Sequence, residues 1–394
     1  MSCDIIVPVW DQLEFTKNCL ESIYENTEYP FKLIVIDNNS GKKTEEYLRN
    51  FRDKDNDRVV LVRNKKNLGF VKASNQGLKR SSGEYVCLLN NDTIVTRNWI
   101  SNMISIFHNN PKIGIINPIW QGVKGGTPQK CADLLQVNKG KFMEVNDCMG
   151  FCFLIKREVI DKIGYLDEIF GMGGKEDSDY CKRAVIEGFR CVRAKDTFVY
   201  HYENASFSRA KNWRKDRETN ERIFEQKWGK RKQVVFILDD NFLDIEQLID
   251  KLKMCLSLAR VGVRVHVWMF LNGKSKAMDK EYLRLNDIVE HNNIKYAYFF
   301  YPRIGFLRDM IRPIFYLFCL IKLASRRNKS DINKYRAVFV VNRALNGFLN
   351  GLKFLHRVKI FNRAESVAPI QREIEWIRNI EEKKFHVAGE VRQT

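Results

Sequence analysis

The sequence lacks the patterns that mark disulfide-stapled, zinc-binding and membrane-spanning proteins. Its ten cysteines form no CxxC pair and stand at no zinc spacing from a histidine, which disfavours a zinc site and a disulfide framework. They are expected to be small buried hydrophobic residues in a reducing compartment. The longest apolar run, residues 314–321, is far too short to cross a bilayer, and no signal-peptide pattern opens the chain. We therefore expect a cytoplasmic protein.

Size and charge indicate a two-domain globular protein with an anionic partner. The 394 residues suffice for two cores, 44% of them are hydrophobic, and no low-complexity tract interrupts them. The formal net charge is +19. Such a charge suits a membrane surface, a nucleic acid or a phosphorylated substrate, and it equally suits a merely well-solvated surface.

Strand and helix patterns alternate through the first half of the chain. The expected strands are 3–9, 31–36, 59–62 and 86–89, and the expected helices are 14–25, 44–51 and 72–80. This order predicts a parallel sheet with right-handed crossovers. We expect an α/β fold in which a Rossmann-like, mostly parallel sheet domain is followed by a smaller α/β domain, also Rossmann-like.

A polar, basic stretch at 226–232 separates the two halves, and a second alternation follows it. The expected elements are strands at 234–238, 263–270, 295–300, 337–341 and 358–361 and an amphipathic helix at 244–260. We place the boundary near 231, giving domains 1–231 and 232–394. The second domain is expected to serve acceptor binding, docking or oligomerisation.

An acidic signature at 88–93 follows the buried strand 86–89. The carboxyl ends of strands in α/β sheets face the crevice where ligands bind. Asp92, with the amide oxygen of Asn90 two residues earlier, offers hard oxygen ligands for Mg²⁺ or Mn²⁺ carrying a diphosphate. An ordinary surface turn is the alternative for such an Asn-Asn-Asp sequence.

Residues after the first two strands suit a nucleoside. Trp10, within Pro8-Val9-Trp10, could stack on a base, and Asp37 could accept a hydrogen bond from a base N–H. Packing of the aromatic ring and turn formation by the aspartate are the alternatives.

A glycine-containing loop opens the helix that begins near residue 70. Gly69 allows a close backbone approach, and Lys72 stands one turn into the helix, where it could meet a phosphate. A solvated lysine is the alternative for Lys72, and Asn75 is expected to tie the helix to neighbouring loops.

Paired carboxylates follow a run of glycines at 171–174. Glu176 and Asp177 behind such a loop suit a general base on a mobile lid, although Asp177 or Ser178 could simply cap the helix. His201 is expected at a strand end, where it could join a metal-diphosphate site or be structural.

Taken together, these segments resemble the inverting, nucleotide-sugar-dependent glycosyltransferases of family 2, which have the GT-A fold. The resemblance covers roughly residues 4–205 and rests on segments in matching order: 6–10, 35–40, 67–70, 75–77, 83–93, 155–159, 163–168 and 176–177. Asn90 in place of the first aspartate of the family's DxD motif is similar to the rhamnosyltransferase-type branch.

The resemblance implies a role for each matching residue. Asp92, with His201, would hold Mg²⁺ or Mn²⁺, and Asp177, with Glu176 beside it, would be the catalytic base. The donor would contact the residues Pro8, Val9, Trp10, Asp37, Asn67, Gly69, Lys72, Asn90 and Asn91. The implied reaction transfers a sugar from a UDP- or dTDP-sugar to a hydroxyl of a saccharide or lipid-linked saccharide acceptor, in the synthesis of cell-surface polysaccharides or glycoconjugates.

Two other functions are weighed against this one. A sugar nucleotidylyltransferase would need a glycine-rich, basic loop directly after the first strand, which is absent. A nucleic-acid-binding protein is suggested by charge alone, has no RRM, KH or helix-turn-helix pattern, and is not expected.

The C-terminal half adds two expectations. Its start faintly resembles a GT-B N-terminal lobe, although too few residues remain for a second lobe. Residues 303–336 interleave nine Lys or Arg with apolar residues against two aspartates, a pattern typical of contact with an anionic membrane surface. A core helix with one solvated face, kinked at Pro313, is the alternative. An oligomer would also be compatible with this sequence.

Overall fold

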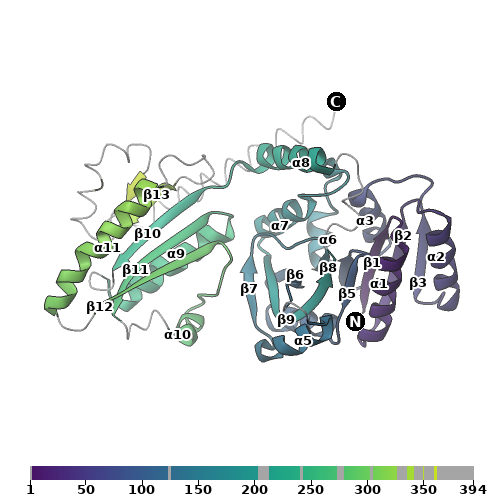
Figure 1. The fold of residues 1–394 in the computed structure, drawn as a ribbon, viewed down its shortest axis with the longest axis horizontal. Coiled ribbons are helices and arrows are strands. Elements are labelled where there is room, and N and C mark those ends of the chain that lie inside the picture. Colours follow the sequence, from purple (N-terminus) through teal and green to yellow (C-terminus); the bar gives the residue numbers. More distant parts are fainter. Residues whose placement is uncertain are drawn as a thin grey trace. The chain divides into compact units, whose positions relative to one another are not determined.

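A computed structural model describes residues 2–122, 126–202, 213–239, 243–272, 279–301, 305–325, 335–340, 349 and 359–361. The chain divides into two compact units, Met1–Phe224 and Glu225–Thr394 (Figure 1). Each unit is built on its own sheet.

The first unit is built on nine strands. They are β1 (Cys3–Val9), β2 (Phe31–Asp37), β3 (Val59–Arg63), β4 (Tyr85–Leu89), β5 (Thr93–Val95), β6 (Ile113–Ile119), β7 (Phe142–Val145), β8 (Cys152–Lys156) and β9 (Arg190–His201). The sheet order is β3-β2-β1-β4-β8-β6-β9-β5, with β7 also paired to β9. Strands β1–β4, β6 and β9 point one way, and β5, β7 and β8 point the other. The sheet is therefore mostly parallel.

The helices of the first unit cover both faces of this sheet (Figure 1). They are α1 (Leu13–Asn26), α2 (Lys42–Lys54), α3 (Phe70–Leu78), α4 (Trp99–Asn109), α5 (Pro128–Leu135), α6 (Arg157–Ile163) and α7 (Glu176–Ile186), with short 3₁₀ turns η1 (Gln136–Asn138) and η2 (Glu168–Phe170). Helix α8 (Trp213–Trp228) contains the division between the units.

Strand β1 shows why the sheet is covered on both faces. All seven of its residues are buried, as expected for a central parallel strand. Its odd positions pack into one hydrophobic core with α1 and α4, and Ile6 packs into the other with α3. Gly77 lets α3 approach this closely, because a Cβ there would overlap the side chain of Ile6.

The second unit is a smaller parallel sheet with the order β12-β11-β10-β13-β14. Its elements are β10 (Gln233–Asp239), α9 (Ile245–Arg260), β11 (Arg264–Asn272), α10 (Lys280–Leu285), β12 (Ile294–Tyr301), α11 (Gly305–Ser325), β13 (Tyr335–Val340) and β14 (Lys359–Phe361). Helix α9 packs against the face of this sheet to which Phe236 and Leu238 of β10 contribute. Helix α11 packs against the opposite face, to which Val235 and Ile237 contribute.

The fold class predicted from the sequence, a Rossmann-like GT-A sheet domain followed by a smaller α/β domain, is confirmed. All ten cysteines are buried, as their scatter predicted, and none of them forms a disulfide bond. Within the parts of the chain that the structure describes, none of the helices has the length and apolar character needed to cross a membrane.

Candidate active site

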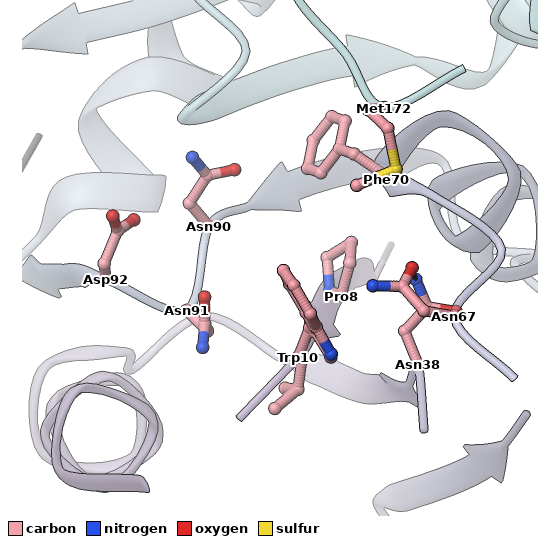
Figure 2. A pocket seen from close by; sticks show the side chains of 10 residues that line it. Pro8, Trp10, Asn38, Asn67, Phe70, Asn90, Asn91, Asp92 and Met172 are labelled. Atoms are coloured by element: carbon pink, nitrogen blue, oxygen red, sulfur yellow. Dashed lines mark hydrogen bonds between the residues drawn. The ribbon is translucent and has the colours of Figure 1, made fainter. Parts of the chain in front are cut away.

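A pocket opens at the carboxyl ends of β1 and β4 in the first unit. It encloses about 590 Å³, including its open mouth. Its lining residues are Pro8, Val9, Trp10, Asn38, Asn67, Phe70, Asn90, Asn91, Asp92 and Met172. Trp10 and Pro8 lie between an amide pair, Asn38 and Asn67, and the acidic segment of Asn90 and Asp92 (Figure 2). Six predicted donor residues and the predicted metal ligand Asp92 therefore meet in one cavity.

A network of amides shapes the wall opposite the acidic segment. The Asn38 side chain donates to Oδ1 of Asn67 (2.7 Å) and accepts hydrogen bonds from the Leu68 backbone N–H (2.9 Å) and from Asn64 (3.0 Å). Oδ1 of Asn67 also accepts from the backbone N–H of Gly69 (2.8 Å). The loop before α3 is thus held in place by side chains that neighbour the pocket.

Three predicted donor residues, Asp37, Gly69 and Lys72, do not line this pocket. Asp37 is buried at the end of β2, where one carboxylate oxygen is paired with Arg63 and the other accepts the Ser40 backbone N–H (2.8 Å). Lys72 is half-exposed on α3, with Nζ 3.9 Å from Oε2 of Glu168. Asp37 therefore holds the β2 and β3 strand ends together, and Lys72 lies on the solvent side of its helix.

The start of α3 is pressed against the glycine loop that precedes α7. A Cβ at Gly69 would lie 2.8 Å from the carbonyl oxygen of Gly171 and 3.3 Å from Sδ of Met172. The backbone N–H of Val71 donates to that same carbonyl (3.2 Å). Gly69 thus allows a close backbone approach to the loop that precedes the predicted base.

Replacing Gly69 by alanine should destabilise the first unit more than the same change at Gly188, a glycine with a similar φ. Gly69 has φ +84° and Gly188 has φ +89°, but a Cβ at Gly188 would meet nothing within 4 Å. We expect a loss of about 1–2 kcal/mol for Gly188→Ala and roughly 2–4 kcal/mol for Gly69→Ala in urea unfolding, because overpacking adds to the φ penalty. If the two variants lose the same free energy of unfolding, a Cβ at position 69 does not clash with the 171–174 loop.

Asn90 and Asn91 fix the acidic segment by backbone and side-chain contacts. The Asn90 N–H donates to the Phe151 carbonyl (2.8 Å), and the Asn90 carbonyl accepts from Oγ1 of Thr93 (2.8 Å). Nδ2 of Asn91 donates to Oγ1 of Thr16 (2.9 Å). Asn91 and Asp92 are 5% and 3% exposed, so the alternative of a plain surface turn is wrong.

His201 lies beside Asp92 because β5 pairs with the end of β9. Thr93 is opposite His201 in this antiparallel register, and the Tyr202 N–H donates to the Asp92 carbonyl (3.0 Å). Nε2 of His201 is 3.2 Å from Oδ1 of Asp92, at an angle outside hydrogen-bond geometry. The ring of His201 stacks on Phe151, with centroids 4.9 Å apart.

Three buried polar atoms at this place have no hydrogen-bond partner: Oδ1 of Asn90, Oδ1 of Asp92 and Nδ1 of His201. Buried polar atoms without partners are rare and call for an unseen ion or ligand. Among the described residues, no group of three or more His, Cys, Asp and Glu side chains could hold a metal alone. One or two protein ligands with substrate phosphates are a usual environment for Mg²⁺, so these residues fit a metal-diphosphate.

Glu176 and Asp177 open α7, directly after the glycine loop. The N-cap position is Lys175 with φ 119°, so the alternative that Asp177 or Ser178 caps this helix is wrong. Asp177 accepts the backbone N–H of Gly150 at Oδ2 (3.0 Å) and that of Ser178 at Oδ1 (2.7 Å), and Glu176 accepts the N–H of Gly174.

Burial changes the protonation of this pair. Burial, with the charge of neighbouring Asp177, raises the pKa of Glu176 to about 8. Burial also raises the pKa of Asp177, while the hydrogen bonds from Ser178 and Gly150 lower it. Because two adjacent carboxylates resist double ionisation, the buried Glu176 favours its protonated form near neutral pH.

One dipeptide, Gly150-Phe151, connects the acidic segment to the carboxylate pair. Gly150 donates to Asp177, and Phe151 accepts from Asn90 while its ring stacks on His201. Asp177 itself is not among the residues that line the pocket. Asp177 and Asn90 are thus bound to neighbouring residues of a single segment before β8.

Several residues of the site were not predicted from the sequence. Asn38, Phe70 and Met172 line the pocket, and Gly150-Phe151 links its two parts. Asn38 and Phe70 lie inside the segments that carry the family resemblance, which could have marked them. Nothing in the local sequence marks Met172 or Gly150-Phe151, because their contacts arise from the antiparallel strand β8 and the loop before α7.

A pocket at the carboxyl ends of parallel strands is the usual ligand site of α/β enzymes. Residues 4–164 match the family model described as Glycosyl transferase family 2. The first unit therefore carries a family 2 glycosyltransferase domain, and the predicted enzyme class is confirmed.

Relatives and solved structures resemble this chain only in part. The O-antigen biosynthesis protein RfbC of Myxococcus xanthus is 25% identical over 232 residues, which are 51% of this chain and 17% of that protein. The poly-beta-1,6-N-acetyl-D-glucosamine synthase of Staphylococcus aureus is 30% identical over 170 residues, 40% of this chain and 39% of the synthase. The mannosyltransferase PcManGT of Pyrobaculum calidifontis, solved with GDP-Man and Mn²⁺, is 20% identical. The likeness covers 55% of this chain and 60% of that chain, with a TM-score of 0.43. The chain thus spans well under half the length of these curated relatives.

Proposed function

We propose that this protein transfers a sugar from a nucleoside-diphosphate sugar to a hydroxyl of a saccharide acceptor, with inversion at the anomeric carbon. The observation that carries the proposal is the Gly150-Phe151 dipeptide, which holds the predicted base Asp177 and the predicted metal segment at Asn90. A base and a leaving-group site that share one support can act on the same sugar carbon.

The donor occupies the pocket in this proposal. Trp10 stacks on the base, the Asn38 and Asn67 side chains contact the nucleoside, and the diphosphate extends toward Asn90 and Asp92. Asp92 and His201 would hold Mg²⁺ or Mn²⁺, which offsets the charge that develops on the departing diphosphate. We favour uridine or deoxythymidine as the nucleoside, as the family resemblance implies.

The acceptor side depends on the carboxylate pair. Asp177 takes the proton of the acceptor hydroxyl as its oxygen attacks the anomeric carbon opposite the departing diphosphate. Glu176, protonated near neutral pH, adds no second negative charge beside that oxygen. A saccharide or lipid-linked saccharide acceptor, used in the synthesis of surface polysaccharides, completes the proposal. The second unit would support acceptor binding, docking or oligomerisation.

A panel of nucleotide sugars tests this function. We expect at least one UDP- or dTDP-sugar to raise the melting temperature only when Mn²⁺ or Mg²⁺ is present, since binding to the native state stabilises it. The same donor should release nucleoside diphosphate slowly in the absence of acceptor. If no sugar linked to UDP, dTDP or GDP shifts the melting temperature with either metal, the proposal is wrong.

A further inference from the structure

Helix α11 of the second unit is apolar on two opposite sides. On one side Phe315, Cys319 and Leu323 are buried against the sheet. The helix runs without interruption through Pro313, from Gly305 to Ser325. A helix that covers one face of a sheet normally turns charged and polar residues to the solvent. The outward side of α11 does not follow this rule.

The outward side carries a row of exposed large hydrophobic residues, here called the α11 stripe. Its members are Phe306 (71% exposed), Leu307 (37%), Met310 (58%), Ile314 (61%), Leu317 (56%) and Ile321 (58%). At 3.6 residues per turn they share an arc of about 100° opposite the buried side. Contiguous exposed apolar surface of this kind marks an interaction site in soluble proteins.

The stripe belongs to a segment of the sequence that is rich in positive charge. On the helix, Lys322 is exposed, and Arg308 lies beside the single acidic residue, Asp309. Arg312 is held by Asp239, with Nε 3.4 Å from Oδ2, so its charge is balanced within the fold. In the sequence, residues 303–336 contain nine Lys or Arg against two Asp. The segment that contains the stripe is therefore cationic in its sequence.

We propose that the α11 stripe binds the surface of an anionic lipid bilayer, with the helix lying in the plane of the interface. Apolar side chains enter the boundary between headgroups and acyl chains, and flanking cations meet anionic headgroups. A second copy of the chain is the less favourable occupant, because two stripes face to face would bring like charges together. This binding does not depend on the transfer reaction.

Vesicle binding by the full chain tests the proposal. At low ionic strength the wild type should co-sediment with vesicles containing roughly 30 mol% phosphatidylglycerol and less with pure phosphatidylcholine, since anionic lipid attracts the flanking cations. The double variant Ile314→Ser/Leu317→Ser should lower the partition coefficient at least about tenfold, because two half-exposed aliphatic side chains no longer enter the bilayer. Sedimentation velocity on both proteins reports their oligomeric state.

A matched pair of exposed hydrophobic residues outside the stripe provides the control. Leu285 and Val137 are 80% and 79% exposed, and Leu285→Ser/Val137→Ser should bind vesicles like the wild type. The proposal fails if the wild type does not bind anionic vesicles, or if Ile314→Ser/Leu317→Ser binds them equally well. It also fails if the wild type is a dimer that this variant converts to monomers, because the stripe would then be an interface between copies.

Discussion

Asp177→Asn will lower the transfer rate by about 10²- to 10⁴-fold, the contribution expected of a positioned general base. Asparagine retains the shape of the side chain and can still accept the Gly150 N–H, but it cannot take a proton from the acceptor. Donor affinity, measured by the metal-dependent thermal shift, should change little because Asp177 does not line the pocket.

Two further measurements separate loss of the base from general damage. Asp161→Asn, at an exposed carboxylate on α6, should leave the rate unchanged. The wild-type rate should rise with pH as Asp177 loses its proton. Because burial raises the pKa of Asp177, this rise should occur above the pH at which an ordinary aspartate titrates. The rate of Asp177→Asn should not show this rise. Transfer within severalfold of the wild type would refute the assignment of Asp177.

Asp92→Asn will remove the metal dependence of donor binding and lower transfer at least about 100-fold, because the diphosphate then leaves without charge compensation. The amide keeps the volume of the buried side chain but loses the charge that a divalent cation requires. The readouts are the thermal shift with nucleoside diphosphate and Mn²⁺, and the rate over a Mn²⁺ titration.

Partial recovery at high Mn²⁺ would fit a weakened ligand set in which His201 remains. Asp57→Asn, an exposed carboxylate in the same unit, is the matched control and should titrate with Mn²⁺ like the wild type. An unchanged Mn²⁺ response in Asp92→Asn would place the cation elsewhere and remove the metal from the proposed site.

Strands β1 to β4 of the first unit and the strands of the second could be predicted because each is an apolar run bounded by turn residues. All five predicted strands of the second domain overlap observed ones, from β10 to β14, and the predicted helix 244–260 is α9 with Asp244 as its side-chain cap. Strands β5, β6, β7 and β8 were not predicted, and of β9 only its end at His201 was. The three or four residues of β5 and β7 carry too little periodicity, and their pairing with β9 is a long-range contact.

The candidate site was predictable where its residues directly follow a strand. Trp10, after β1, and Asp92, after β4, both line the pocket as predicted. Asp37 ends β2 but is paired with Arg63 at the end of β3. The sequence around Asp37 does not indicate this partner. The sequence shows the chemistry of each side chain and its position along a strand. Which of these side chains can contact a ligand depends on partners that lie far away in the sequence.

The sharing of one dipeptide has a mechanical consequence. Phe151 and Gly150 lead directly into β8, whose antiparallel pairing with β4 fixes their position relative to Leu89. Asp92 follows β4, whereas Gly150, which donates to Asp177, precedes β8. A shift of β8 along β4 would therefore change the distance between the proton acceptor and the cation anchor. Substrate alignment is thus as sensitive to the register of two buried strands as to any side chain that touches the donor.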